Sequence, residues 1–541
     1  MSARNQEIEV KNLTINGQAL QAEDGTVILE TARSIGIFIP HYCYHPKLSI
    51  AGCCRMCLVE IQGQPKLQPA CRTPVEEGMI VSTDSPKAIR AQRAQLEFLL
   101  LNHPIDCPIC DQAGECGLQD FYMMEFGQHK SRFAKEEKIK RPKAVAIGPH
   151  IVFDAERCIL CTRCIRFCIE IAKQPEIGTK NRGNHSQITT FPGQQLDNPY
   201  SINTVDICPV GALTSKDFRF KIRPWFLYST PSICPGCANG CNIFICINKK
   251  HYVNLQRAQI YRLKPKENPE VNACWLCDEG RLSYKLVNEN RVLQPHIRQD
   301  GQLVLVSWER AINEIKNRVQ KILTEYGPQR IGALASSKAT NEANYLFKKF
   351  AHEVLETPNL NFLKGLTGYG DDFLIREDKT PNTRGAIDLE IGPGAGGIGA
   401  AEMLSPANPL KGLWIMGAEP TESYDNEQVN EALASLELLI IQTSNFTASC
   451  QWAHIILPSA TFAEVDGTFI NYKGRVQRVF KAMQPRPESL ANEVILGRVA
   501  RAMGYDWQEH TPAEIMRQIA TEIPRYHGLD YDNIGDKGIQ T

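Results

Sequence analysis

Cysteine is the residue type whose number and spacing in this sequence indicate chemistry. The chain has 541 residues and 20 cysteines, and 19 of these lie at or before Cys277. Most stand in tight Cys-x-x-Cys or Cys-x-x-x-Cys groups, and their share lies well below the ~8–10% of a disulfide scaffold. They therefore predict metal ligands in a reducing compartment, and they assign the metal chemistry to the front half of the chain.

The first group is typical of a [2Fe–2S] site. A glycine-containing loop precedes its Cys-x-x-Cys, and the N–H groups of such a loop can bond to cluster sulfurs. Cys53 competes with Cys54, which is preferred because it completes the Cys-x-x-Cys, so Cys53 is expected to be a small buried hydrophobic residue. A zinc site is the alternative. The expected ligands are Cys43, Cys54, Cys57 and Cys71.

The second group combines one histidine and three cysteines on a short segment bent by Pro and Gly, NHPIDCPICDQAGECGLQD. These four side chains can form a complete [4Fe–4S] ligand set. A neutral imidazole in place of a thiolate is expected to raise the cluster potential, as in Rieske centres. A zinc site with the same ligands stays open from spacing alone. The expected ligands are His103, Cys107, Cys110 and Cys116.

The third group, RCILCTRCIRFC followed by a remote Cys-Pro in ICPVGALT, has the specific pattern of a [4Fe–4S] ferredoxin site. Cys168 would extend it to a two-cluster ferredoxin. No second triplet lies near the remote cysteine, so Cys168 is expected to be a spare. The expected ligands are Cys158, Cys161, Cys164 and Cys208.

The fourth group, SICPGCANGCNI, predicts a further [4Fe–4S] site whose last ligand lies downstream. Cys277 is preferred to Cys274, because the Gly-Arg after it in CDEGR could turn the chain around a cluster. Cys246, on the apolar strand-like NIFICI, is expected in the core. The expected ligands are Cys234, Cys237, Cys241 and Cys277.

Local patterns predict the elements that position the first two groups. Alternation around Asn16-Gly17 indicates a hairpin, and Pro40 is expected to end a preceding helix. Ser85 followed by a proline predicts a helix start, and the end of that helix would deliver His103. The predicted elements are a hairpin at 9–20, helices at 26–39 and 85–101, and a strand at 57–61.

Beyond Arg281 the pattern changes to alternating strands and helices, which predicts an α/β layered domain. Residues 364–412 are rich in Gly, Pro, Asp and Asn without clear periodicity, so part of a larger domain is expected to be missing or remodelled there. The predicted strands are LVLVS, RIGALAS, GLWIMG and LELLIIQ, and the predicted helices are 308–326 and 341–355.

A formal G-x-G-x-x-G pattern lies in this region. Gly394, Gly396 and Gly399 follow the strand-like AIDLEI, but Pro406 and Pro409 leave little room for the helix that a dinucleotide site needs. A flexible loop is the expected structure, and no nucleotide or flavin site is predicted on this chain.

Composition excludes several other classes. Lys+Arg and Asp+Glu each number 60 and the pI is about 7.1, so neither nucleic acid nor an anionic membrane is expected as a partner. Apolar runs fall far below the ~20 residues of a spanning helix. The first residues, MSARNQEIEV, lack the apolar stretch of a secretory signal, so export by that route is not expected.

The order of the four groups, with RCILCTRCIRF and ICPVGALTSK, closely resembles the 75 kDa iron–sulfur subunit family of respiratory complex I, including its bacterial members in NADH:quinone oxidoreductase. The resemblance is dense over 1–283 and resumes at 454–478, which looks like the end of a molybdopterin-oxidoreductase domain. It implies an α+β and α/β multidomain fold. The implied domains are a β-grasp [2Fe–2S] ferredoxin domain (1–84), a [4Fe–4S] segment ligated by one His and three Cys (85–124), a [4Fe–4S] ferredoxin-like domain (145–225), a Mo/W bis-MGD-type [4Fe–4S] domain (227–283) and a shortened molybdopterin-oxidoreductase-like α/β domain (284–541).

The resemblance also implies a function. Electrons from NADH, taken up by a flavin on a partner subunit, would pass through one [2Fe–2S] and three [4Fe–4S] clusters toward quinone, with no catalytic acid, base or nucleophile on this chain. The implied partners are the flavin- and NADH-binding subunit and other iron–sulfur subunits of the peripheral arm of complex I, at the cytoplasmic face of the inner membrane. Alternatives are a subunit of an NAD-linked formate dehydrogenase or NAD-reducing hydrogenase, and a zinc-stapled scaffold.

Two departures from the molybdopterin-oxidoreductase pattern concern the carboxyl-terminal half. At about 260 residues it is short for such a domain, and no cysteine between Cys277 and Cys450 could coordinate molybdenum. The domain is therefore expected to bind no molybdopterin. Since every proposed ligand lies at or before Cys277, a fragment of residues 1–283 is expected to carry every cluster.

Overall fold

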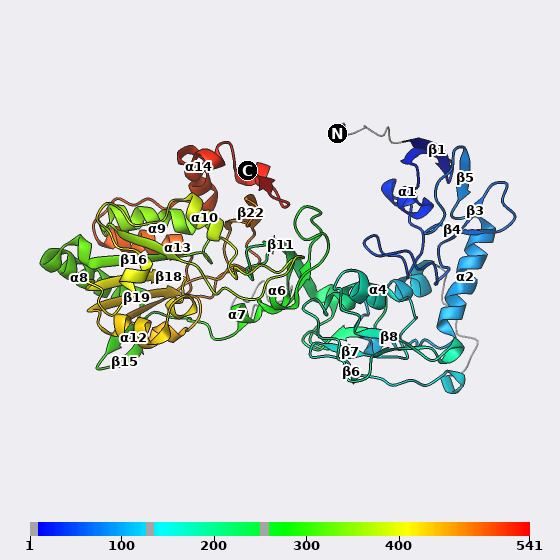
Figure 1. The fold of residues 1–541 in the computed structure, drawn as a ribbon, viewed down its shortest axis with the longest axis horizontal. Helices are drawn as coiled ribbons and strands as arrows, with labels where there is room; N and C mark the ends of the chain where they lie inside the picture. Colours follow the sequence, from blue (N-terminus) through cyan, green and yellow to red (C-terminus); the bar gives the residue numbers. More distant parts are fainter. Residues whose placement is uncertain (1–8, 126–134, 249–258) are drawn as a thin grey trace. The chain divides into compact units, whose positions relative to one another are not determined.

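The computed structural model describes residues 9–125, 135–248 and 259–541 (Figure 1). The chain divides after Trp225 into two compact units. The first unit contains the three cysteine groups up to Cys208, and the second contains the fourth group together with the α/β region. The five domain boundaries predicted from the sequence are finer than this division and stay a prediction.

The first unit begins with a five-stranded sheet in the order β2-β1-β5-β3-β4. The predicted hairpin is confirmed, since β1 pairs antiparallel with β2 around the left-handed residues Asn16 and Gly17 (φ 49° and 81°). The predicted helix over 26–39 is too long, because α1 ends at Ser34 and Gly36 takes a φ of 77°. The elements are β1 (Val10–Ile15), β2 (Gln18–Glu23), α1 (Ile28–Ser34), β3 (Leu58–Ile61), β4 (Gln68–Pro69) and β5 (Met79–Ser82).

Helix α2 (Pro86–Leu100) leads from this sheet to the segment that holds His103. Its predicted start is confirmed, because the Ser85 hydroxyl accepts a hydrogen bond from the Ala88 N–H at 3.2 Å. The segment after it forms only short helical turns, which suits a chain that must bend around a site. These turns are η1 (Cys107–Ile109), α3 (Gly117–Asp120) and η2 (Phe121–Glu125).

The rest of the first unit surrounds the third cysteine group with short elements. A three-stranded sheet has the order β10-β7-β6, and β8 pairs antiparallel with β9. Helix α4 starts directly after Cys161 and Thr162, so the Cys-x-x-Cys-x-x-Cys runs from a loop into a helix. The elements are β6 (Val145–Ala146), β7 (Ile151–Phe153), α4 (Arg163–Glu170), β8 (Ile177–Lys180), β9 (Gln187–Thr190), α5 (Asn203–Ile207) and β10 (Leu213–Ser215).

The second unit brings residues near its start together with residues near its end. Its first sheet, β11-β12-β13, follows Phe226, and another, β21-β22-β23, is built from residues beyond 466. Ile233 on β11 packs with Phe469 and Val479 of the second sheet. The elements are β11 (Leu227–Ile233), β12 (Asn242–Asn248), β13 (Ile260–Pro265), α6 (Asp278–Leu282), α7 (Lys285–Asn288), β21 (Gly467–Ile470), β22 (Arg475–Val479) and β23 (Ile539–Gln540).

A seven-stranded sheet in the order β15-β14-β20-β19-β18-β16-β17 forms the centre of this unit. The five strands from β20 to β17 are parallel, as expected for strands that alternate with helices. The predicted helix over 308–326 coincides with α8. The elements are β14 (His296–Gln299), β15 (Gln302–Leu305), α8 (Trp308–Tyr326), β16 (Ile331–Ser336), α9 (Asn341–Glu353), β17 (Asn359–Leu363), β18 (Gly412–Met416), α12 (Asn426–Ala434), β19 (Leu438–Thr443), β20 (Ile455–Pro458), α13 (Asn492–Ala502), α14 (Pro512–Glu522) and α15 (Tyr531–Ile534).

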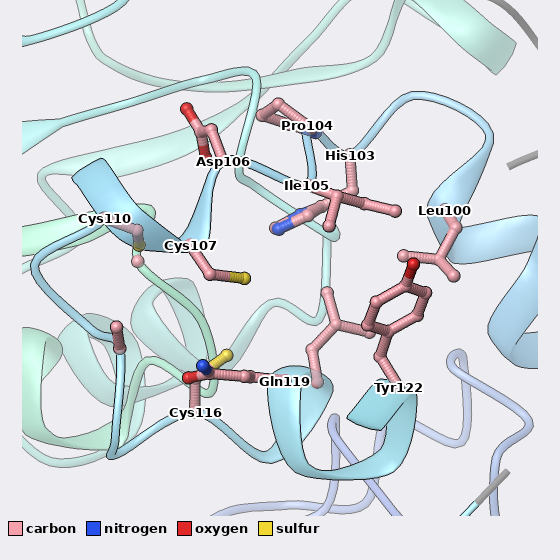
Figure 2. A pocket seen from close by; sticks show the side chains of 13 residues that line it. Leu100, His103, Pro104, Ile105, Asp106, Cys107, Cys110, Cys116, Gln119 and Tyr122 are labelled. Carbon is pink, nitrogen blue, oxygen red and sulfur yellow. The ribbon is translucent and has the colours of Figure 1, made fainter. Parts of the chain in front are cut away.

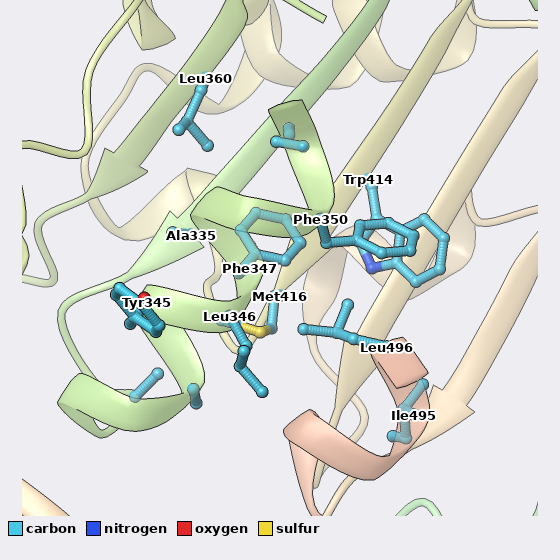
Figure 3. Packing of buried hydrophobic residues seen from close by; sticks show 14 of the residues in the cluster. Ala335, Tyr345, Leu346, Phe347, Phe350, Leu360, Trp414, Met416, Ile495 and Leu496 are labelled. Atoms are coloured by element: carbon cyan, nitrogen blue, oxygen red, sulfur yellow. The ribbon is translucent and has the colours of Figure 1, made fainter. Parts of the chain in front are cut away.

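Apolar side chains cover both faces of this sheet, and successive residues of a strand point to opposite faces. On β18, Trp414 and Met416 join one buried cluster and Ile415 joins the other. Figure 3 shows Phe350 of α9 against Trp414, with Phe347 of the same helix to one side and Leu496 of α13 nearby. The ring centroids of Phe350 and Trp414 lie 5.1 Å apart in an edge-to-face arrangement.

One prediction for residues 364–412 is corrected. The strand-like AIDLEI is not a strand, because its first half lies in helix α10 (Thr383–Asp388) and its second half in a turn, and α11 (Ala400–Met403) begins directly after Gly399. The loop predicted around Gly394 and Gly396 is present. The expectation that part of a larger domain is missing or remodelled at 364–412 stays a prediction, and residues 376 and 378 of this segment contact the loop of the fourth cysteine group.

No helix within residues 9–125, 135–248 and 259–541 has both the length and the apolar character that a bilayer crossing needs.

Phe350→Ala should destabilise the second unit by about 3–5 kcal/mol, because it removes a fully buried ring and leaves a cavity against Trp414. The measurement is equilibrium denaturation followed by tryptophan fluorescence. Leu305→Ala is the control, since this side chain is 61% exposed on the edge strand β15 and its loss should cost less than about 0.5 kcal/mol. Equal costs for the two variants would contradict this packing.

Candidate iron–sulfur sites

The four expected ligands of the first group are buried and lie together in the first unit. The Cys43 thiol is hydrogen-bonded by the thiols of Cys54 and Cys71, and Cys57 by that of Cys71. Cys53 also reaches Cys43, and its side chain is exposed. The expectation that Cys53 is a buried hydrophobic residue is therefore wrong, while the choice between Cys53 and Cys54 stays a prediction.

The loop before the Cys-x-x-Cys has the backbone conformation that turns N–H groups toward sulfur. Gly52 and Arg55 take positive φ angles of 62° and 56°, and the Cys43 N–H points to the Cys54 sulfur at 3.5 Å. At a non-glycine residue this conformation is strained, and it persists only where the surroundings impose it. Such a loop fits a cluster whose sulfurs accept backbone hydrogen bonds.

The second group lines a single pocket (Figure 2). His103 points into it from the end of α2, and Cys107 and Cys116 point into it from the opposite side, while Cys110 completes the lining. Burial lowers the pKa of His103 to about 4, against an opposing contribution from Asp106, so its imidazole is neutral at pH 7. Its Nδ1 atom is buried without a hydrogen-bond partner. A neutral ring with an unpaired buried nitrogen fits a metal ligand.

The third group also lines one pocket, to which Cys158, Cys161, Cys164 and Cys208 all contribute. Leu160 and Thr162, the residues on either side of Cys161, both have positive φ angles (55° and 59°). The Leu160 N–H donates to the Cys158 sulfur at 3.4 Å. The geometry is thus the same as at the first group, with left-handed residues inside the cysteine repeat. Cys168 is fully buried in α4.

The second and third groups approach each other closely within the first unit. A Cβ atom at Gly211, which follows Cys208 by three residues, would lie only 2.2 Å from the Cys110 sulfur. Arg157, next to Cys158, donates two hydrogen bonds to the Asp106 carboxylate, next to Cys107 (3.1 and 2.7 Å). Cysteine spacing does not predict this pair, although a charged residue directly before a cysteine of each group was a signal for it.

The fourth group is assembled in the second unit. Cys234, Cys241 and Cys277 are buried and interact electrostatically. A Cβ atom at Gly280 would lie 2.8 Å from the Cys234 sulfur and 3.2 Å from that of Cys277. This close approach favours Cys277 as the last ligand, since only glycine leaves both sulfurs room. The Gly280 N–H donates to Cys277 at 3.3 Å, and the Gly236 N–H points to Cys234 at 3.5 Å.

Side chains of the α/β region support this fourth group, and no motif in the sequence predicts them. The Asn239 amide donates to the Cys241 sulfur at 3.1 Å and accepts from Arg376 at 3.3 Å. Arg376 lies over the ring of Tyr472, 4.4 Å from its centroid, and the Tyr472 N–H donates to the Ala238 carbonyl at 2.8 Å.

Backbone contacts extend this support. The Ala238 N–H donates to the Asp378 carbonyl at 2.9 Å, and the Gln477 amide donates to the Gly240 carbonyl at 2.9 Å. Residues 376–378 and 471–477 thus hold the loop between Cys237 and Cys241. The sequence predicts that a fragment of residues 1–283 carries every cluster. These contacts argue against that prediction for the fourth group, because the residues that hold its loop lie 137 to 237 positions downstream, outside the fragment.

Burial governs the acid–base state of these thiols. It raises the pKa of Cys158 to about 12 and that of Cys161 to about 11, and the pKa values of Cys234 and Cys241 also lie well above the usual range because of burial. Without iron these four thiols are therefore protonated at pH 7, and cluster binding must release their protons.

Within the described part of the chain, no three His, Cys, Asp or Glu side chains form a group that could hold a single metal ion. The fit to iron–sulfur clusters rests on other features: each group has four candidate ligands, most of their cysteines are buried, and N–H groups point at sulfurs of the first, third and fourth groups.

Family models match the chain in the order of these groups. They are a "2Fe-2S iron-sulfur cluster binding domain" (9–86), an "NADH-ubiquinone oxidoreductase-G iron-sulfur binding region" (92–132), the ferredoxin-like domain of "NADH-quinone oxidoreductase subunit 3" (148–214) and "Molybdopterin oxidoreductase" (291–373 and 378–502). The gap in the last match, 374–377, falls in the segment that contacts the fourth group. Both [2Fe–2S] and [4Fe–4S] binding domains are thus present.

Curated relatives carry the same assignment. The chain is 35% identical over 469 residues to the G subunit of NADH-quinone oxidoreductase from Rickettsia conorii, a match that covers 84% of this chain and 67% of that protein. The chain belongs to this iron–sulfur subunit family. It is 42% identical over 342 residues to the Rickettsia bellii member (63% of this chain, 48% of that protein) and 39% identical over 343 residues to the NADH-ubiquinone oxidoreductase 75 kDa subunit of Reclinomonas americana (63% and 48%). The chain thus spans about half the length of these last two relatives.

This membership confirms the resemblance and the mixed multidomain fold class predicted from the sequence. The individual ligand residues stay predictions.

Substitution of single cysteines should separate ligands from spares. Cys54→Ser and Cys158→Ser should each lose one cluster, because a hydroxyl is a harder and poorer ligand for iron than a thiolate. Cys53→Ser and Cys168→Ser are the matched controls and should keep the full iron content, measured together with the electron paramagnetic resonance spectrum of the reduced protein. Loss of a cluster in Cys53→Ser with retention in Cys54→Ser would reverse the first assignment.

Proposed function

We propose that this chain is an iron–sulfur electron-transfer subunit of NADH:quinone oxidoreductase, which passes electrons from NADH, by way of a flavin on a partner subunit, toward quinone. One observation supports this proposal: the residues that we assign to the first three ligand sets lie in one compact unit, and the third group contacts both the first and the second. The Cys53 sulfur lies 3.9 Å from the Leu160 carbonyl oxygen, and Gly211 abuts Cys110. Such an order suits electron transfer from site to site.

The ligand assignment is part of the proposal. Each bound cluster would supply a one-electron carrier, with a potential set by its ligands, its burial and its hydrogen bonds. We assign one [2Fe–2S] and three [4Fe–4S] clusters, the fourth-site cluster being the one that the α/β region supports. The sets are Cys43, Cys54, Cys57 and Cys71; His103, Cys107, Cys110 and Cys116; Cys158, Cys161, Cys164 and Cys208; and Cys234, Cys237, Cys241 and Cys277.

The chain's own residues have positioning and electrostatic tasks in this function. Neutral His103 takes the place of a thiolate and so reduces the negative charge at the second site. The N–H groups of Leu160, Gly236 and Gly280 direct positive partial charge at cysteine sulfurs. Arg157 and Asp106 tie the second ligand segment to the third. No proton needs to move at any of these atoms.

The proposal extends to partners and location. We infer that the chain docks with the flavin- and NADH-binding subunit and with other iron–sulfur subunits in the peripheral arm of complex I, at the cytoplasmic face of the inner membrane. Membership of the iron–sulfur subunit family supports this inference.

We further infer that the α/β region binds no molybdopterin. Cys450 follows the long interval without cysteine, and its sulfur accepts from the Thr447 N–H at 3.4 Å. It is buried in the apolar cluster on one face of the central sheet. That position suits a core residue better than a metal ligand. Structural support of the fourth site explains the presence of the α/β region even if this region binds no pterin.

The test of function is anaerobic purification of the full chain with metal analysis. About 14 iron atoms per chain should be present, from one two-iron and three four-iron clusters. The clusters should be reduced by dithionite or by the NADH-reduced flavin subunit, and the isolated, flavin-free chain should not oxidise NADH.

Zinc in place of most of the iron would instead support a structural scaffold. Molybdopterin together with formate oxidation would support a formate dehydrogenase. NADH oxidation by the flavin-free chain would also contradict the proposal.

When the chain is cut between its two compact units, each fragment should retain the clusters of its own unit. A fragment of residues 226–541 should retain one [4Fe–4S] cluster, with about four iron atoms, and a fragment of residues 1–225 should retain the other three, with about ten. A fragment of residues 1–283 should lack the fourth cluster, because it lacks Asn239's partner Arg376 and the Asp378 carbonyl. The measurement is iron content with the spectrum of each fragment. A stable fourth cluster in the 1–283 fragment would show that these contacts are dispensable.

A further inference from the structure

The first and third ligand groups are joined by side chains from one face of helix α4. Arg163, Arg166 and Glu170 follow each other at spacings of three and four residues, which places them on the same face of the helix. All three contact residues 43–49, the loop that begins with the first expected ligand of the [2Fe–2S] site.

Arg166 makes the largest set of these contacts. Its Nη2 atom donates to the carbonyl oxygens of Cys43 at 2.5 Å and of Cys161 at 3.2 Å, which are residues of two different ligand groups. Its Nη1 atom donates to the Ser49 carbonyl, and its Nε atom to the Thr162 hydroxyl at 3.3 Å. The residue is only 9% exposed. One planar guanidinium thus fixes both loops at once, as its fork of donors allows.

Arg163 repeats this bridge one turn earlier. It donates to the Tyr44 carbonyl, next to Cys43, and to the Ile207 carbonyl at 3.1 Å, next to Cys208. Glu170 completes the face by accepting from the Ser49 N–H at 2.8 Å and from its hydroxyl at 2.5 Å. The first and third groups are therefore connected through two guanidinium groups and one carboxylate.

Near the expected ligands, the positive charges of this helix face are not paired with carboxylates. Among the ion pairs of the described residues, none involves Arg163 or Arg166, whose hydrogen bonds go to neutral carbonyls and a hydroxyl. A buried charge is costly unless opposite charge lies near it. The nearby candidates are the sulfurs of Cys43, Cys161 and Cys208, which interact electrostatically with Arg163.

We propose that Arg166, together with Arg163, is a positioning residue that holds the first and third cluster-binding loops at a fixed separation and raises the reduction potentials of both sites. This inference rests on the proposed function. Each reduction adds one electron and one negative charge to a site, so fixed positive charge nearby favours the reduced form. An electron that leaves the first site reduces the third, with no bond broken and no proton transferred.

The test compares Arg166→Met with Arg166→Lys in the full chain. Arg166→Met removes the charge and the donors, so the midpoint potentials of the [2Fe–2S] and ferredoxin-like [4Fe–4S] clusters should both become more negative. The magnetic coupling between the two reduced clusters should also weaken, and the potentials of the other two clusters should stay the same. Arg166→Lys keeps the charge but cannot span both carbonyls in one plane, so it should restore the potentials more fully than the coupling.

Glu170→Ala is the matched control for a merely structural role. It releases the Ser49 backbone from the same helix face, but it removes a negative charge, so it should loosen the loop without lowering either potential. If Arg166→Met loses its clusters, the same comparison between Arg163→Met and Glu170→Ala decides the matter. Unchanged potentials and coupling in an iron-replete Arg166→Met protein, or equal negative shifts in Glu170→Ala, would overturn the proposal.

A second measurement separates this proposal from the proposed function. Hydrogen exchange at the amides of residues 44–49 reports on the loop whatever metal the protein holds, and Arg166→Met should accelerate it. A wild-type chain without redox-active clusters would overturn the function, whereas unchanged exchange in Arg166→Met would overturn the bridge.

Discussion

The structure depends on the burial of sulfur. The cysteines of the third and fourth groups lie in apolar surroundings, where the negative charge of a thiolate is unfavourable and the pKa of the thiol rises. Ligation to iron removes the proton but leaves the charge, so the protein must supply compensating dipoles and cations. It supplies N–H groups from loops with left-handed residues such as Leu160 and Thr162, and guanidinium groups from the helix that follows.

This constraint explains which features could be predicted from the sequence. A Cys-x-x-Cys is local, so its loop, its ligands and the helix after it can be inferred from spacing, and Ser85 and the pattern at 308–326 define their helices in the same local way. The pattern at 26–39 predicts too long a helix because the apolar run continues to Ile39, while Gly36 in a left-handed conformation ends the helix. Cys53 is expected in the core because free cysteine is usually a small buried hydrophobic residue, yet its thiol projects toward the third group.

What spacing could not predict are the contacts between segments far apart in the sequence. The loop after Cys237 depends on Arg376, which lies in no recognisable pattern, and on Tyr472. Tyr472 lies in the segment 454–478 that resembles the end of a domain, but this resemblance does not predict a contact with a cysteine loop. The irregular composition of 364–412 suggests lost structure, because glycine and proline there break periodicity. In the folded unit the same irregular segment lets residues 376–378 lie along the loop between Cys237 and Cys241. The match to the molybdopterin-oxidoreductase model is interrupted at residues 374–377, in the same segment. The α/β region is thus a structural part of the fourth site.

The two links within the first unit differ in charge. Between the second and third groups, Arg157 faces the carboxylates of Asp106 and Asp154, so its charge is largely neutralised where it lies. Between the first and third groups, Arg166 faces carbonyl oxygens, and its charge remains available to the sulfurs. Since Coulomb energies between partly buried charges reach about 4 kcal/mol at 4 Å for an effective dielectric constant near 20, this difference in partners is large enough to matter for a potential. Arg157 therefore mainly fixes the positions of the second and third groups. Arg166 both fixes the positions of the first and third groups and supplies charge to them.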